Sequence, residues 1–207
     1  MPYTAPAAAS AERMSHVTGT MIAVPGGQKP VEQLEVGDLV LTKDNGAQPI
    51  RWIASRALNA SSFKADPSLR PIRIQAGALG DQKPERDLVV SQNHCVLISD
   101  WRCELLFGED EVLAPAKALL NDSTITIDHT CEDVTYYHFI FDQHEIVYSN
   151  NVETESFHPA AGLDMVDDAK REELFKIFPQ LEDDIDAFGP QARASLTSQE
   201  VEVLMAC

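Results

Sequence analysis

Short apolar runs, many of them alternating with polar residues, follow one another along residues 20–156. Ile50 and Trp52 flank Arg51, and the same period of two recurs in PIRIQ at 71–75. This period is typical of half-buried strands, because successive side chains of a strand point to opposite faces. The remaining runs are MIAV (21–24), DLVLT (38–42), DLVVS (87–91), CVLIS (95–99), TITI (124–127), VTYYHFIF (134–141), EIVYS (145–149) and VETE (152–155). So many short strands predict an all-β sandwich or barrel rather than a parallel sheet with crossing helices.

Turn residues separate the runs. Pro25-Gly26-Gly27 follows the first run, and Asn45-Gly46 lies between two later ones, where both residues tolerate positive φ and predict a hairpin. Two stretches interrupt the pattern. Residues 54–70 are polar and rich in Ser and Ala, which predicts a surface loop, and residues 111–122 indicate a short helical or irregular excursion.

The period changes after Pro159, where apolar residues recur at helical spacing. They share one side of a predicted helix that begins after Asp164 as N-cap and stops at Pro179. Thr197 and Glu200 have the spacing of a capping box that opens a last short helix. The apolar positions of the first helix are Val166, Ala169, Leu174, Ile177 and Phe178.

These patterns divide the chain into three predicted parts. Residues 1–14 are small and polar and predict a flexible N-terminal arm, residues 15–158 form the β-domain, and residues 159–207 form a helical C-terminal tail. The first 14 residues lack the apolar segment of a secretory signal, so the default location is the cytoplasm, with export by another route left open.

Composition narrows the class of protein. With 44% hydrophobic residues the chain can bury a core, and no apolar run reaches the ~20 residues of a membrane-spanning helix. A net charge of -17 argues against nucleic acid and anionic membranes as partners. The spacing of the cysteines matches no familiar zinc ladder, even with His129 added, so neither a metal nor a cofactor is predicted. The four cysteines are Cys95, Cys103, Cys131 and Cys207.

Three blocks of the sequence together resemble the Hint domain, the self-processing module of hedgehog proteins and inteins, in its bacterial branch. The first is GTMIAVPGGQKPVEQLEVGDLVLTKDNG (19–46), the second RDLVVSQNHCVLI (86–98), and the third YYHFIFDQHEIVYSNNVETESFHP (136–159). They occur in the order of the family and cover roughly residues 15–158. The resemblance implies a mainly β fold of the Hint type, to which the helical tail is added.

The resemblance also implies a chemistry. In the family, the first residue of the domain attacks the carbonyl just upstream, and a histidine and a hydroxyl from the second block assist. Counting back from Gly19 places Ser15 at the nucleophile position, with His94 as proton donor, Ser91 as its hydroxyl companion and His138 as a further polar group. Each has a plain alternative: a linker residue for Ser15, a residue bonded to the local backbone for Ser91, and buried core histidines for the other two.

The departures from the family pattern limit the function. The family's cysteine is replaced by Ser15, whose hydroxyl needs stronger activation than a thiol. Glu155-Ser156 stands where inteins end in His-Asn, so full splicing is not expected. The sequence therefore predicts hedgehog-like N-terminal autocleavage, with the upstream polypeptide as its own substrate and the acyl group of Met14 passed to water or another nucleophile.

Two other functions stay open. One is a Hint-derived module that has lost its chemistry and serves as a binding or scaffold domain for a protein partner. The other is an unrelated β-rich enzyme that uses His94 and Cys95. Their adjacency in sequence argues against it, because neighbouring side chains on a strand point to opposite faces.

Overall fold

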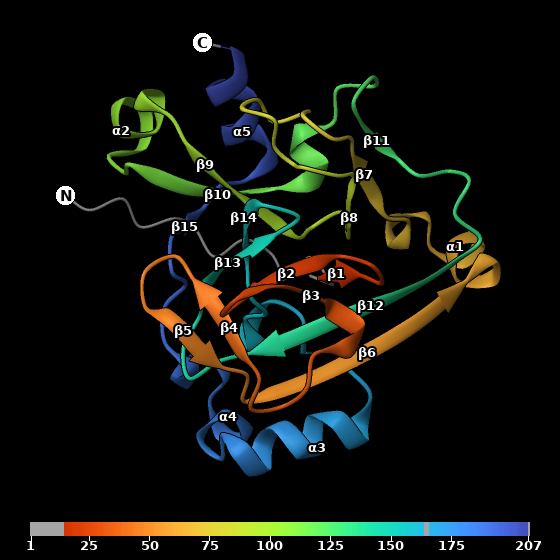
Figure 1. Ribbon diagram of the computed structural model, residues 1–207, viewed down its shortest axis with the longest axis vertical. Coiled ribbons are helices and arrows are strands. Elements are labelled where there is room, and N and C mark those ends of the chain that lie inside the picture. The colour runs from red at the N-terminus through yellow and green to blue at the C-terminus, as the bar shows by residue number, and fades with distance from the viewer. Residues whose placement is uncertain (1–14, 164–165, 207) are drawn as a thin grey trace.

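Two β-sheets form most of the protein, and short helices lie at two opposite ends of it (Figure 1). The computed structural model describes residues 15–163 and 166–206. The first sheet has six strands, in the order β11 (Ile125–Ile127), β7 (Ile72–Ile74), β8 (Leu88–Val90), β1 (His16–Val17), β12 (Asp133–Ile140) and β6 (Trp52–Asn59). The predicted mainly β fold with C-terminal helices is confirmed.

The second sheet has nine strands. Seven follow one path, which runs β15 (Ala194–Ser195), β10 (Glu111–Pro115), β9 (Cys95–Ser99), β14 (Val152–Glu155), β13 (Ile146–Ser149), β2 (Met21–Val24) and β3 (Gly27–Pro30). The other two lie off this path, with β4 (Leu39–Thr42) pairing with both β13 and β5 (Gly46–Pro49).

The predicted hairpins form. Strands β2 and β3 pair around the turn at Pro25-Gly26, and β4 pairs with β5 so that Thr42 lies opposite Gly46. Gly46 has a φ of +65°, a conformation that side chains disfavour, and its carbonyl accepts a hydrogen bond of 2.8 Å from the Thr42 hydroxyl. The turn thus fixes the register of the hairpin.

Of two predictions between the blocks, one is wrong and the other holds only in part. Residues 54–70 are not a loop, because β6 runs on to Asn59 and pairs with β12 over eight residues, after which α1 (Ala60–Ala65) begins. The stretch 111–122 is mostly not helical, because β10 pairs with β9 over five residues before a 3₁₀ turn at Ala116–Leu119. In both places backbone pairing with a distant strand outweighs the weak local pattern.

The helices α2 (Trp101–Phe107) and α5 (Ser198–Ala206) lie at one end of the molecule, with α3 (Asp168–Ile177) and α4 (Gln180–Asp183) at the other (Figure 1). Helix α3 takes Asp167 as its N-cap, through a 2.9 Å bond from the Lys170 N–H. The predicted cap Asp164 lies outside the described residues, as does the arm 1–14. Before α5, Thr197 and Glu200 bond each other's backbone N–H groups, so the predicted capping box is confirmed.

The tail shares a hydrophobic core with the β-domain. The indole of Trp52, in β6, is fully buried and donates from Nε1 to the carbonyl of Lys170 in α3 at 3.1 Å. The cluster around it draws buried residues from both parts, namely Trp52, Ala54, Ile140 and Phe157 from before the tail and Val166, Leu174, Phe178, Leu181 and Phe188 from within it.

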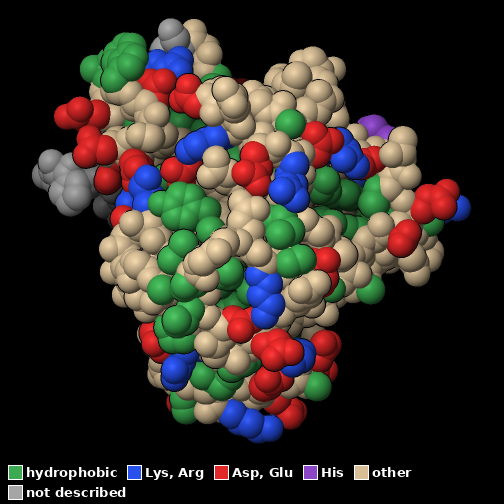
Figure 2. Space-filling model, viewed as in Figure 1, with side chains coloured by type: hydrophobic (Ala, Val, Ile, Leu, Met, Phe, Trp, Pro, Cys, Tyr) green, Lys and Arg blue, Asp and Glu red, His purple; other side chains and the backbone are tan. Residues whose placement is uncertain are grey.

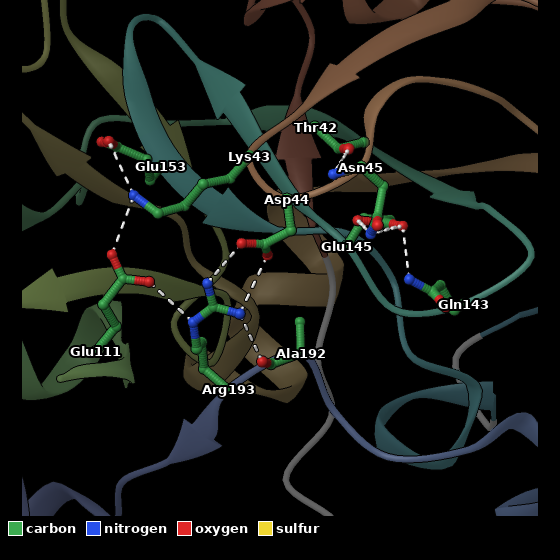
Figure 3. A network of polar contacts seen from close by, with 10 residues as sticks. All are labelled: Thr42, Lys43, Asp44, Asn45, Glu111, Gln143, Glu145, Glu153, Ala192 and Arg193. Atoms are coloured by element: carbon green, nitrogen blue, oxygen red, sulfur yellow. Dashed lines mark hydrogen bonds and ion pairs between the residues drawn. The ribbon is translucent and has the colours of Figure 1, made fainter. Parts of the chain in front are cut away.

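A network of charged side chains fastens the end of the tail to the second sheet (Figure 3). Arg193 reaches Asp44 in the β4–β5 turn and Glu111 in β10, each at 2.8 Å, and Lys43 also contacts Glu111. Next to Arg193, the short strand β15 pairs in parallel with β10. The tail is therefore held by backbone pairing, ion pairs and a shared core.

On the face seen in Figure 2, acidic and basic side chains are scattered among one another. Among residues 15–163 and 166–206, no helix is long and apolar enough to cross a membrane.

Candidate active site

Strand β1 lies in the middle of the first sheet, between β8 and β12, and begins at His16, so that Ser15 directly precedes it. The Ser15 carbonyl accepts a hydrogen bond from the Ser91 N–H at 3.3 Å. Its hydroxyl oxygen lies 3.4 Å from Nδ1 of His138, which comes from β12. Ser15 is only 3% exposed, so the candidate nucleophile is a buried residue at the entry to the sheet.

The turn after β8 supplies the other two predicted residues. The His94 N–H donates to the Ser91 carbonyl at 3.2 Å, which closes a tight turn before β9. Both side chains are buried. The His94 ring packs edge-on against the ring of His16, with centroids 4.6 Å apart. The fold therefore brings the Ser15 hydroxyl to His138, joins Ser91 to Ser15 through the backbone, and packs His94 against His16, the residue after Ser15.

Sequence reasoning missed His16. Its ring stacks on Phe139 at 5.2 Å, and its Nε2 lies 2.8 Å from the Ser149 hydroxyl and 3.3 Å from that of Thr154. Burial, followed by the nearby His94 and His138, holds its pKa well below the usual value. His16 is therefore a neutral ring that backs His94, and its position beside Ser15 was the only signal in the sequence.

Electrostatics make His138 a neutral residue. Burial, with further contributions from His94 and Arg56, lowers the pKa of His138 to about 3. A neutral imidazole has one nitrogen free of a proton and can accept one. If Nδ1 is that nitrogen, it can take the proton of the Ser15 hydroxyl.

A cavity of about 420 Å³ opens beside His138, between β6 and the start of α3. Its walls combine charged side chains of both signs with small apolar ones. They are formed by Ala54, Ser55, Arg56, His138, Val166, Asp167, Asp168 and Arg171.

Comparison with known protein families identifies the family of this chain, because the model of the Hint domain matches residues 14–161. The chain belongs to the Hint domain family. Members of this family are self-processing domains, so the chain carries a self-processing type of fold.

Three solved structures show similarity to this Hint domain. A bacterial intein-like domain from Clostridium thermocellum has 15% sequence identity over 70% of this chain and 99% of its own, with a TM-score of 0.46. The gp41-1 intein has 14% identity over 68% of this chain and 97% of its own, with a TM-score of 0.38. A splice-inactive variant of the AceL NrdHF class 3 split intein has 11% identity over 69% and 97%, with a TM-score of 0.43. A comparison with curated proteins gives no significant match.

The far end of the Hint domain is fixed by hydrogen bonds. The Ser156 carbonyl lies 3.1 Å from Nε2 of His144, whose Nδ1 accepts from the Ala192 N–H at 2.9 Å. Since Nδ1 is an acceptor, Nε2 carries the proton and donates to Ser156. The Ser156 hydroxyl accepts from the Glu145 N–H at 3.0 Å. These contacts give His144 a role in the fold.

The cysteines of the Hint domain occupy separate places. Cys95 packs with Leu113 and Ile146, Cys103 lies in the largest core cluster, and Cys131 packs beside Tyr136. Cys95 and the neighbouring His94 therefore enter different surroundings, which weighs against a Cys-His enzyme. No three His, Cys, Asp or Glu side chains within 15–163 and 166–206 are grouped to hold a metal ion.

Proposed function

We propose that this Hint domain cleaves its own chain between Met14 and Ser15 by an N-to-O acyl shift. The observation that carries the proposal is the 3.4 Å approach of the Ser15 hydroxyl to Nδ1 of His138 in a buried site. Met14 lies outside the described residues, and the upstream polypeptide is the substrate.

In the first step the Ser15 oxygen bonds to the carbonyl carbon of Met14 while its proton moves to His138. The bond from that carbon to the Ser15 nitrogen then breaks, and His94 supplies the proton that the nitrogen takes up. His138 passes the Ser15 proton on to His94, so that both rings end in the protonation state in which they began. The Ser91 hydroxyl donates to the oxyanion that forms in between. The product is an ester, which water or another nucleophile opens to release the upstream segment.

Because the reaction is intramolecular, the fold contributes through orientation. Effective molarities of about 10⁵–10⁸ M are reached when the reacting groups are well aligned. The pairing of β1 with strands on both sides holds the backbone at His16, directly after Ser15, and supports the proposal that the nucleophile is held in a fixed position. At the other junction Ser156 replaces the asparagine that inteins use, so we expect no cleavage there.

The test uses the full chain with an affinity tag fused ahead of Met1. The purified protein is incubated with and without hydroxylamine, which opens esters, and the products are weighed by mass spectrometry. We expect release of the tagged segment ending at Met14, faster with hydroxylamine, and no release from Ser15→Ala.

Ser15→Cys serves as the second variant, because a thiol is a stronger nucleophile in the same place. Cleavage by this variant alone would show a competent site whose serine is too weak. An intact mass for both proteins under all conditions would refute the proposal and leave the non-catalytic binding module. In that case, partner capture should survive the double substitution Ser15→Ala, His94→Ala.

A further inference from the structure

Most of the exposed large apolar side chains of this Hint domain lie on two neighbouring helices. Within the described residues seven such side chains are exposed, and α2 and α5, which contact each other, carry five of them. Figure 2 shows a group of hydrophobic side chains at this end of the molecule, beside several acidic ones. The five side chains form what we call the α2–α5 surface, namely Trp101, Leu105 and Leu106 in α2 and Val203 and Met205 in α5.

Helix α2 turns its large apolar residues toward solvent. Trp101 and Leu105 are about one helical turn apart and share a face, and they are 72% and 71% exposed. Only Cys103 of this helix is buried. Monomeric proteins rarely expose a contiguous group of large apolar side chains, and such a group marks an interaction surface.

Acidic side chains lie among the apolar ones. Glu104 and Glu202 are exposed, and each directly precedes an exposed apolar residue. Residues 100–110 hold four acidic side chains and one basic, and α5 holds two acidic and none basic. The basic one, Arg102, is paired with Asp100 at 2.8 Å. The α2–α5 surface is therefore both apolar and negatively charged.

This charge distinguishes between the occupants that could cover the surface. A second copy of the chain would bring the same acidic residues face to face, and like charges across an interface are unfavourable. An anionic membrane would be repelled for the same reason. A partner that surrounds an apolar strip with basic residues fits both features, since it covers Trp101 and places its cations beside the glutamates.

We propose that the α2–α5 surface binds a basic amphipathic helix of another protein. The apolar face of that helix covers Trp101, Leu105 and Val203. Its Lys or Arg side chains pair with Glu104 and Glu202. Apolar residues at helical spacing are a common means by which a peptide recognises such a surface, and tryptophan is often the dominant side chain, so Trp101 is the expected anchor. This inference does not depend on self-cleavage.

Tryptophan fluorescence in the full chain gives the first test. The chain has two tryptophans, and because Trp52 is fully buried, a change of emission on binding reports on Trp101. The probe is a synthetic peptide of Leu and Lys, about 18 residues long, with Leu on one helical face. We expect a saturable shift of the emission to shorter wavelength. A scrambled peptide of the same composition should bind about 10-fold more weakly, because it lacks the apolar face.

Variants of the full chain locate the binding site through the fluorescence anisotropy of a labelled peptide. The double substitution Leu105→Ser, Val203→Ser should weaken binding by about 10-fold or more. Val36→Ser, Leu39→Ser is the matched control, since both side chains are exposed but lie outside the α2–α5 surface, and its Kd should equal that of the wild type. No loss in the first variant, or an equal loss in both, would overturn the inference.

A second pair of variants tests the role of charge. Glu104→Gln, Glu202→Gln should weaken binding by about 3-fold or more at low salt, and less at high salt. Glu35→Gln, Glu132→Gln changes the net charge equally at exposed positions elsewhere and should leave the Kd unchanged. Equal effects of the two pairs would mean that the peptide responds only to the net charge of the protein, and the inference would be wrong.

The other occupants are tested directly. Vesicles of phosphatidylcholine that shift the Trp101 emission while the peptide does not would assign the surface to a lipid. A wild-type dimer in sedimentation velocity that dissociates in Leu105→Ser, Val203→Ser would assign it to a second copy. Either result would reject a helical partner, whereas a monomer that ignores vesicles and binds the peptide supports it. A chain that never cleaves leaves these expectations unchanged, so the two proposals fail separately.

Discussion

Lowering the pH from 7 to 5 should destabilise this Hint domain through His138. In the folded protein its pKa is about 3, against a usual value of 6.5 in the unfolded chain. Between these values only the unfolded chain binds the proton, so the stability that this residue contributes above pH 6.5 is lost as the pH falls. Each pH unit inside this window costs about 1.4 kcal/mol, which gives a loss of about 2 kcal/mol between pH 7 and pH 5.

The assay is urea unfolding of the wild type and of His138→Gln at both pH values, in buffers that contain no carboxylate. His16 has its pKa shifted in the same direction, so the wild type alone would overstate the contribution of His138. The comparison removes this, and the variant should lose about 2 kcal/mol less than the wild type over the same range. Equal losses in the two proteins would show that His138 titrates normally in the fold, and the reasoning from burial would be wrong.

Three further substitutions test the attachment of the tail. Leu174→Ala removes a fully buried side chain from the shared core and should cost about 2–5 kcal/mol in urea unfolding; a cost near zero would mean that α3 does not pack there. Thr197→Ala breaks the capping box and should lower stability by about 1 kcal/mol, a fall in Tm of about 2–4 °C by calorimetry, and an unchanged Tm would contradict the cap. Arg193→Gln breaks partly exposed ion pairs worth about 1 kcal/mol, so global stability should change little while hydrogen exchange at Leu196 speeds up. Unchanged hydrogen exchange at Leu196 would show that the ion pairs of Arg193 do not hold the tail on the second sheet.

The fold was largely predictable because its signals are local. Period two, the hairpin at Asn45-Gly46 and the capping box at Thr197 each depend on neighbours in sequence. The part of strand β6 after Ile53 was missed because its buried side chains are Ala54 and Leu58, and the small Ala54 and Ser55 carry little pattern. Its partner over eight residues is β12, which is distant from it in the sequence, so no local pattern predicts the pairing.

The site was only partly predictable for a related reason. Ser15, Ser91, His94 and His138 were singled out by their place in the blocks of the resemblance. In the structure the Ser15 hydroxyl lies against His138, while Ser91 contacts Ser15 through the backbone and His94 packs on His16. The role of His16 depends on Ser149, 133 residues away, with which no local pattern connects it. The cavity was not foreseen either, since β6 and α3, which line it, are far apart in sequence.

The core that the tail shares with the β-domain bears on how this protein can be divided. The sequence pattern changes at residue 158, but the cluster around Trp52 crosses that point. An expression fragment ending there would leave Trp52, Ile140 and Phe157 facing water, without the helices that cover them, and an apolar surface of that kind favours aggregation. Shortened forms intended for engineering should therefore retain α3 and α4. They should also retain β15 and α5, because Leu196, Val201 and Leu204 belong to a second buried cluster shared with the β-domain.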